Sequence, residues 1–215
     1  NKILNSIAEA NDLDGVINVA DFNDETKLGK GKDLVETVSN LIGAFQKPEL
    51  DFVNNRADND DLLGDAYEYL MKNFASESGK SKGQFYTPSE VSRVMAKVIG
   101  IHKDTRHSLS IYDPTCGSGS LLLKAWHETL HPDSASIFGQ EKDISNVGMA
   151  KMNMVLHHNE TPEILNGDTL NNPRFIHGND LDTFEYIVAN PPFSTKSWLK
   201  GAKENDIFGR WGNGV

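Results

Sequence analysis

The sequence predicts an α/β fold in which helices wind around a parallel sheet, preceded by a helical N-terminal region. Short apolar runs typical of buried strands alternate with amphipathic helical stretches in the second half of the chain. Polar and glycine-rich segments follow the ends of these strands. The first third of the chain shows apolar residues only at helical spacing. These three observations place any ligand site in the second half.

The N-terminal region contains two clear helical patterns. One runs from Asp61 to Phe74, and an earlier one ends before Lys47-Pro48, with apolar residues at Leu34, Val35, Val38, Leu41, Ile42 and Phe45. Gly29 to Lys32 lack the spacing of a phosphate-binding loop and follow no strand, so we interpret them as a surface turn. We therefore assign residues 1–80 to a helical N-terminal domain and linker, and residues 81–215 to the sheet domain.

The sheet domain is predicted to begin with a helix. Thr87 can cap it, Pro88 suits the first helical position, and Glu90 completes a capping box. The strands that follow are predicted at 109–112, 136–139, 163–165 and 186–189, separated by helices from 120 to about 130 and from 144 to about 157. Such a sheet, wound on both faces, binds ligands at the carboxyl ends of its strands.

Composition limits the classes of function. The net charge of −10 argues against a free-standing nucleic-acid binder, although a partner subunit can supply the phosphate contacts. One cysteine allows no disulfide within the chain, and there is no apolar run near the length of a membrane span, so we expect a cytoplasmic protein with no membrane association. Because the chain starts at Asn1 rather than Met and ends at Val215 without a closing element, we expect it to belong to a longer protein.

A glycine-rich loop follows the first strand, from Asp113 to Leu122. Gly117 and Gly119 let the backbone approach a ligand, and the helix that follows offers unpaired N–H groups. A dinucleotide site would need a third glycine where Leu122 stands, so the nicotinamide interpretation is disfavoured. Cys116 is predicted to be a small buried side chain rather than a nucleophile. The seven histidines show no metal-ligand spacing, and we predict no metal.

Acidic residues follow the next two strands. Glu141 stands about 20 residues beyond the glycines, where a carboxylate in nucleoside-binding sheets accepts hydrogen bonds from ribose hydroxyls. Asp168 lies in the segment Asn166-Gly167-Asp168-Thr169-Leu170. Since Gly-Asp is common in turns, its position after a strand is the main reason to regard Asp168 as a site residue.

The segment Asn190-Pro191-Pro192-Phe193 follows the last predicted strand. The Asn190 side-chain oxygen and the Pro191 carbonyl can accept both hydrogens of an amino group, which favours the positive charge that develops as its nitrogen attacks an electrophile. Proline fixes its own φ and restricts the residue before it, so these acceptors are held stiffly. Phe193 offers a flat face for a base that has left its duplex.

Together with Gly83 to Pro88, these segments resemble the modification subunit of type I restriction-modification systems over residues 83 to 193. That family consists of Rossmann-like adenine-N6 DNA methyltransferases that use S-adenosyl-L-methionine (SAM). The resemblance implies four catalytic residues, Asn190, Pro191, Pro192 and Phe193. It implies SAM binding by Gln84, Phe85, Tyr86, Thr87, Pro88, Ser89, Asp113, Thr115, Cys116, Gly117, Ser118, Gly119, Glu141, Asp168 and Leu170.

The resemblance also implies partners. A specificity subunit reads the DNA, a restriction subunit completes the nuclease, and each complex is expected to hold more than one modification subunit. The acidic charge is consistent with this division of labour. The later strands of such a sheet have no counterpart in the sequence, so we expect the methyltransferase domain to be incomplete at its C-terminus.

Three alternatives remain open. Protein glutamine methyltransferases use Asn-Pro-Pro-Tyr, which Phe193 and the upstream cofactor motif disfavour. Cytosine-N4 enzymes more often carry Ser in place of Asn190, whereas C5-cytosine enzymes attack with a Pro-Cys motif that the sequence lacks. A non-catalytic subunit that kept the fold is disfavoured by the intact motif at residues 190–193.

Overall fold

The structure is a computed structural model that describes residues 2–11, 13–48, 69–70, 87–157, 162–192 and 206–211. The chain divides into two compact units, Asn1–Ala66 and Tyr67–Val215. The first contains α1 (Lys2–Ala10), α2 (Glu25–Leu28) and α3 (Lys32–Phe45). Among the helices in these ranges, none is both long and apolar enough to cross a membrane.

The first unit confirms two predictions. The helix expected to end before Lys47-Pro48 is α3. The predicted turn lies between α2 and α3, where Gly29 and Gly31 both have positive φ. Of the helix predicted from Asp61 to Phe74, only Tyr69 and Leu70 are described, and both are helical.

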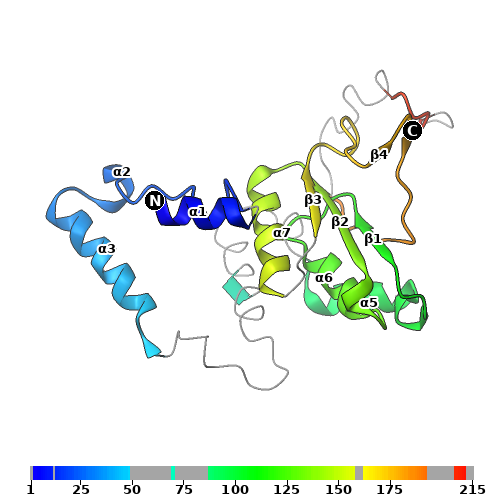
Figure 1. The fold of residues 1–215 in the computed structure, drawn as a ribbon, viewed down its shortest axis with the longest axis horizontal. Coiled ribbons are helices and arrows are strands. Elements are labelled where there is room, and N and C mark those ends of the chain that lie inside the picture. The colour runs from blue at the N-terminus through cyan, green and yellow to red at the C-terminus, as the bar shows by residue number, and fades with distance from the viewer. Residues whose placement is uncertain are drawn as a thin grey trace. The chain divides into compact units, whose positions relative to one another are not determined.

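The second unit is built on a parallel sheet in the order β3-β2-β1-β6 (Figure 1). These strands are β1 (Ser110–Asp113), β2 (Ser136–Glu141), β3 (Glu163–Asn166) and β6 (Tyr186–Ile187). All four were predicted, within a residue or two at each end. The prediction that the last strand is buried was only partly right, because Ile187 is 57% exposed whereas Val188 is buried. The reason is position: β6 is an edge strand of the sheet as described.

Three helices cover one face of this sheet, α5 (Ser89–Val98), α6 (Ser120–His127) and α7 (Ile144–Leu156) (Figure 1). α6 contacts α5, α7, β1 and β2. Two 3₁₀ helices, η3 (Ile101–Lys103) and η4 (Pro132–Ser134), lie in the connections. The core between helices and sheet contains fully buried side chains, including Ile111, Leu122, Leu123, Ile137 and Met154. Burial of this apolar face fixes the sheet against the helices.

Helices were expected on both faces, and for the described residues this was wrong. The second face is covered by aromatic side chains from the segment between β3 and β6. The ring of Phe184 stacks on Tyr112 at 4.4 Å between centroids, and Phe175 packs edge-on against Phe138 at 5.7 Å. The same segment contains an antiparallel pair that was not predicted, β4 (Ile176–His177) and β5 (Asp180–Leu181).

The predicted cap of α5 was also wrong. The helix begins at Ser89, and the residue at its N-cap is Pro88, with φ −52° and ψ 138° and no side-chain cap. The backbone carbonyl of Pro88 accepts the first helical hydrogen bond, from Ser92 at 3.0 Å. Thr87 therefore lies one position too early to cap the helix, and its hydroxyl has a different partner, described below.

Two glycine substitutions test the close packing of Gly119 against α7, one at Gly119 itself and one at an uncrowded glycine for contrast. Gly119 has φ +79°, and a Cβ there would lie 2.7 Å from Met154 Cε and 3.4 Å from Ala150 Cβ. We expect Gly119→Ala to lower the free energy of unfolding by about 1–2 kcal/mol, because a side chain is strained in the left-handed region. Gly43→Ala, in α3 with open space around it, should instead raise stability by about 0.5–1 kcal/mol. Urea denaturation measures both changes, and changes of the same sign would contradict a conformational requirement for glycine at position 119.

Candidate functional site

The predicted site residues gather at the carboxyl edge of the sheet. β1 ends at Asp113 and β2 ends at Glu141, while Asp168 and Asn190 follow β3 and β6. Because all four strands are parallel, these ends lie on the same edge.

The glycine loop is held from three sides. The Thr115 N–H donates to Asp113 Oδ1 at 2.8 Å, and the Cys116 N–H donates to the Gln140 carbonyl at 3.1 Å. From α7, Asn153 Nδ2 donates to the Ser118 carbonyl at 3.0 Å. The loop between β1 and α6 is therefore fixed by its own strand, by β2 and by a helix.

Asp113 is 2% exposed. Burial, supported by the nearby charge of Glu141, raises the pKa of its carboxyl to about 7, although the hydrogen bonds from Thr115 act in the opposite direction. In this structure the side chain holds its own loop in place.

Glu141 joins two elements. Its Oε2 accepts from the Gly117 N–H at 2.9 Å and its Oε1 accepts from the Asp143 N–H at 2.8 Å. Asp143 in turn caps α7 by accepting from the Ser145 N–H at 2.9 Å. A carboxylate has about four acceptor positions, so the described contacts leave about two of them for a ligand.

Cys116 is packed rather than reactive. It is 5% exposed, and a Cβ placed on Gly139 would lie 3.0 Å from its Sγ. Burial raises the pKa of the thiol well above its usual range. The thiolate is therefore disfavoured at neutral pH, in keeping with the predicted small buried side chain.

Asp168 is fully engaged by its neighbours. Its Oδ1 accepts from the backbone N–H groups of Leu170 and Asn171 at 3.1 and 3.2 Å. Its Oδ2 accepts from Lys142 Nζ at 2.7 Å and Asn171 Nδ2 at 3.1 Å. Partial burial acts to raise the pKa of this carboxyl, but these hydrogen bonds and the Lys142 charge outweigh it and hold the pKa below its usual value.

Arg210 was missed by the sequence analysis. Its Nη1 donates to the Thr169 carbonyl at 3.0 Å and its Nη2 to the Leu170 carbonyl at 2.8 Å. Asp206 holds the guanidinium, with Nε to Oδ1 at 2.7 Å. Arg210 thus clamps the loop that carries Asp168. No local pattern could reveal this contact, because the partners are about 40 residues away in the sequence.

Asn190 is linked to the start of the sheet domain. Its Nδ2 donates to Thr87 Oγ1 at 3.1 Å across 103 residues. The Val188 N–H donates to the Tyr112 carbonyl at 2.9 Å, so the chain stays paired to β1 beyond β6. Pro191 and Pro192 are exposed.

Several predicted residues lie outside the described part of the chain, namely Gln84, Phe85, Tyr86 and Phe193. Of Ser89, only its place as the first residue of α5 is described.

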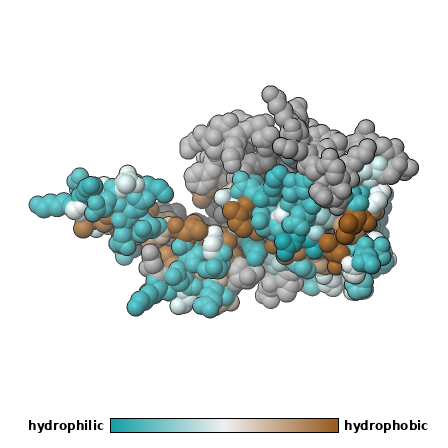
Figure 2. Space-filling model, turned by 90° about the horizontal axis from the view of Figure 1, so that it is seen from above, coloured by the Kyte–Doolittle hydropathy of each residue, from teal (hydrophilic) through white to brown (hydrophobic). Residues whose placement is uncertain are grey.

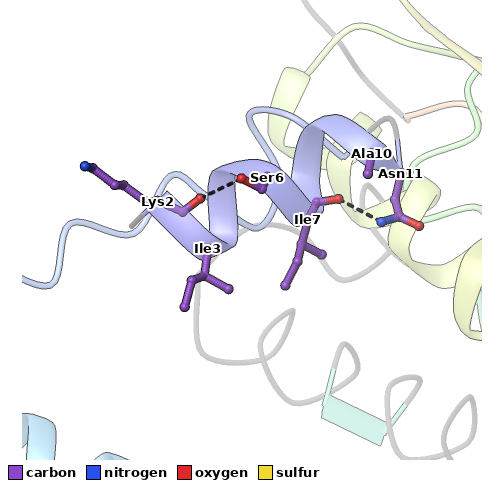
Figure 3. Close-up of a pocket in the computed structure, with 6 residues that line it drawn as sticks. All are labelled: Lys2, Ile3, Ser6, Ile7, Ala10 and Asn11. Carbon is purple, nitrogen blue, oxygen red and sulfur yellow. Dashed lines mark hydrogen bonds between the residues drawn. The ribbon is translucent and has the colours of Figure 1, made fainter.

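A surface hollow in the first unit does not compete with this edge of the sheet as a ligand site. Figure 3 shows a hollow lined by Lys2, Ile3, Ser6, Ile7, Ala10 and Asn11, all from α1 or the residue after it. Two of its polar side chains bond to the helix backbone. Ser6 Oγ donates to the Lys2 carbonyl at 3.1 Å, and Asn11 Nδ2 donates to the Ile7 carbonyl at 2.8 Å. On the face seen in Figure 2, hydrophilic residues surround scattered hydrophobic ones. The carboxyl edge of the sheet is therefore the candidate site.

A parallel sheet with a glycine loop after β1 and acidic residues at the ends of β2 and β3 is typical of a Rossmann-like α/β fold. The profile of the N-6 DNA Methylase family matches residues 58–214, and the chain belongs to this family.

Known relatives agree with this assignment. The type I restriction enzyme MpnII methylase subunit of Mycoplasma pneumoniae is 36% identical over 197 residues, which cover 86% of this chain and 35% of that protein. The MjaVII methylase subunit of Methanocaldococcus jannaschii is 30% identical over 214 residues, or 94% of this chain and 33% of that one. The chain thus spans about a third of the length of these relatives.

Solved structures give the same picture of the fold. The type I restriction-modification methyltransferase subunit from Streptococcus thermophilus has a TM-score of 0.75 and 32% identity, covering 97% of this chain and 44% of that one. A class I S-adenosylmethionine-dependent methyltransferase from Listeria monocytogenes has a TM-score of 0.55 at 17% identity, a likeness of fold alone.

The buried Asp113 predicts an unusual dependence of stability on pH. Its pKa is raised to about 7, so between the ordinary carboxyl range and pH 7 the folded chain binds a proton that the unfolded chain does not. Its contribution to the free energy of unfolding should therefore fall by roughly 1.4 kcal/mol per unit of rising pH in that window. Urea denaturation of the wild type and of Asp113→Asn at several pH values isolates this contribution. The Asn variant should lose the decrease of unfolding free energy with rising pH that comes from Asp113. Identical slopes would contradict it.

Proposed function

We propose that this chain is part of a type I modification subunit that transfers a methyl group from SAM to N6 of adenine in DNA. The observation that carries the proposal is the position of Asn190, Pro191 and Pro192 at the same strand edge as the glycine loop and Glu141. Relatives named as type I methylase subunits support it.

The residues at this edge fit SAM. The two acceptor positions left on Glu141 match the two hydroxyls of a ribose. The loop from Thr115 to Gly119 offers backbone groups close to that carboxylate. When bound, SAM supplies a methyl group that is already electrophilic because it sits on a sulfonium.

Asp168 can accept a hydrogen bond from the adenine amino group of SAM only if one of its present donors leaves. All four of its acceptor positions are engaged, so an adenine amino group must displace one donor. We propose that this donor is Lys142, because its side chain is 76% exposed and an exposed ion pair contributes little. The backbone donors of Leu170 and Asn171 keep the carboxylate in place during the exchange.

The target amino group is proposed to lie against Asn190 Oδ1 and the Pro191 carbonyl. Two acceptors on its hydrogens stabilise the positive charge that develops on nitrogen during attack, and the prolines restrict the backbone that presents them. Phe193 is the proposed stacking surface for an adenine extruded from the duplex. The mechanism needs no covalent enzyme intermediate, in keeping with the buried thiol of Cys116.

The proposed partners are DNA, a specificity subunit that reads the sequence and a restriction subunit, with more than one modification subunit in each complex. The net charge of −10 favours an arrangement in which other subunits contact most of the phosphates.

The direct test is to incubate the full-length protein with SAM and DNA, with and without its specificity subunit, and to identify the modified nucleosides by mass spectrometry. N6-methyladenine that appears only with the partner is the expected result. Detection of N4-methylcytosine would mean that the target base is cytosine rather than adenine. SAM binding without any methylated nucleoside would contradict DNA methylation by this subunit.

The catalytic assignment predicts the effect of Asn190→Ala. We expect kcat to fall by about 10²- to 10³-fold, as when a preorganised polar group is removed from other active sites, while the Kd for SAM stays nearly unchanged. Asn179→Ala, at an exposed position in the turn between β4 and β5, is the matched control and should change neither quantity. Equal losses of SAM binding and turnover in Asn190→Ala would mean that Asn190 has only a structural role.

The clamp on the Asp168 loop predicts a separate effect on cofactor binding. We expect Arg210→Ala to raise the Kd for SAM roughly tenfold, because charge-assisted hydrogen bonds to two carbonyls are lost. Arg106→Ala is the control, since Arg106 also pairs with an aspartate, Asp104, which bonds to Tyr186 at the amino end of β6. Isothermal titration calorimetry measures both, and equal shifts would contradict a local role for Arg210.

A further inference from the structure

The hydrogen bond between Asn190 and Thr87 joins two segments that the proposed function treats separately. Asn190 belongs to the proposed catalytic motif, whereas the resemblance implies that Thr87 contacts the cofactor. In the structure, Asn190 Nδ2 donates to Thr87 Oγ1 at 3.1 Å. Both side chains are half-buried, so water competes only partly for this bond.

The Thr87 hydroxyl does not cap α5, although the sequence predicted that role. Pro88 is the N-cap of α5, and the helix has no side-chain cap. The stability of α5 therefore does not depend on this hydroxyl, and a role at Asn190 is the one that the described contacts support.

Both partners are rigid for the same reason. Thr87 precedes Pro88 and Asn190 precedes Pro191, and a residue before proline is restricted to extended backbone conformations. Threonine is also stiff about χ1 because it is β-branched. Little conformational entropy is lost when two such residues pair, so the bond is preorganised before any substrate arrives.

The direction of the bond decides what Asn190 presents. A side-chain amide has one end that donates and one that accepts. With Nδ2 held by Thr87, the acceptor Oδ1 lies on the other side of the amide and is available to an N–H donor. Resting on the proposed function, we infer that Thr87 is a positioning residue that fixes the Asn190 amide with its oxygen toward the target amino group.

The test compares Thr87→Val, which keeps the shape but removes the hydroxyl, with Thr87→Ser, which keeps the hydroxyl. In the full-length protein with its specificity subunit, we expect Thr87→Val to lower kcat about tenfold with the Kd for SAM unchanged within about twofold. Thr87→Ser should retain kcat within about threefold of wild type. Thr183→Val, at an exposed position before β6 and so at the opposite end of that strand, is the control and should match wild type.

The outcomes separate this inference from the proposed function. If Thr87→Val raises the Kd for SAM and leaves kcat at saturating SAM unchanged, Thr87 serves the cofactor and the inference is overturned. If both Thr87 variants lose kcat equally, the hydroxyl is not the cause and the inference is likewise overturned. Thermal unfolding identifies a variant that does not fold. If Thr87→Val does not fold, Thr87→Ala, which also lacks the hydroxyl, replaces it in the comparison with Thr87→Ser. If Asn190→Ala methylates normally, the proposed function itself fails, whatever Thr87 does.

Discussion

The site depends on one carboxylate, that of Glu141. It stands at the end of β2 and accepts hydrogen bonds from the Gly117 N–H and the Asp143 N–H. The first bond fixes the glycine loop after β1, and the second fixes the residue that caps α7. Neutralising this side chain would release both at once, whereas most other contacts at the strand edge hold a single segment. The residue that we propose as the ribose acceptor therefore also holds the two segments that flank its proposed site.

The helix α7 continues this constraint from behind. Asn153 donates to the Ser118 carbonyl, and Ala150 and Met154 pack closely where Gly119 turns the chain into α6. Glycine suits this position because φ is positive and an added Cβ would crowd Met154 Cε and Ala150 Cβ. The glycine loop is thus closed from the strand side by Glu141 and from the helix side by α7.

Much of the sheet was predictable because strands and helices have distinct periodicities, and four strands and three helices were found close to their predicted bounds. The cover of the second face was not, because β4 and β5 are two residues each and Phe175 and Phe184 act through tertiary packing rather than pattern. The cap of α5 was misplaced by one residue, since Thr-Pro-Ser-Glu fits more than one capping register. The site residues at the strand ends could be predicted because their motifs resemble those of a known family and because parallel strands end at one edge of the sheet. Arg210 and the bond between Thr87 and Asn190 could not be predicted, since they depend on contacts distant in sequence.

The basic residues at the strand edge indicate how far this part of the chain could attract DNA. Lys142 is paired with Asp168, and Arg210 is held by Asp206 and by two backbone carbonyls. In this structure both cations are thus engaged by partners within the chain. DNA affinity derives largely from the release of counterions by Lys and Arg that face phosphates, and the net charge of −10 adds repulsion. If the proposed function holds, the attraction that brings a duplex to this edge is therefore best supplied by other surfaces of the complex.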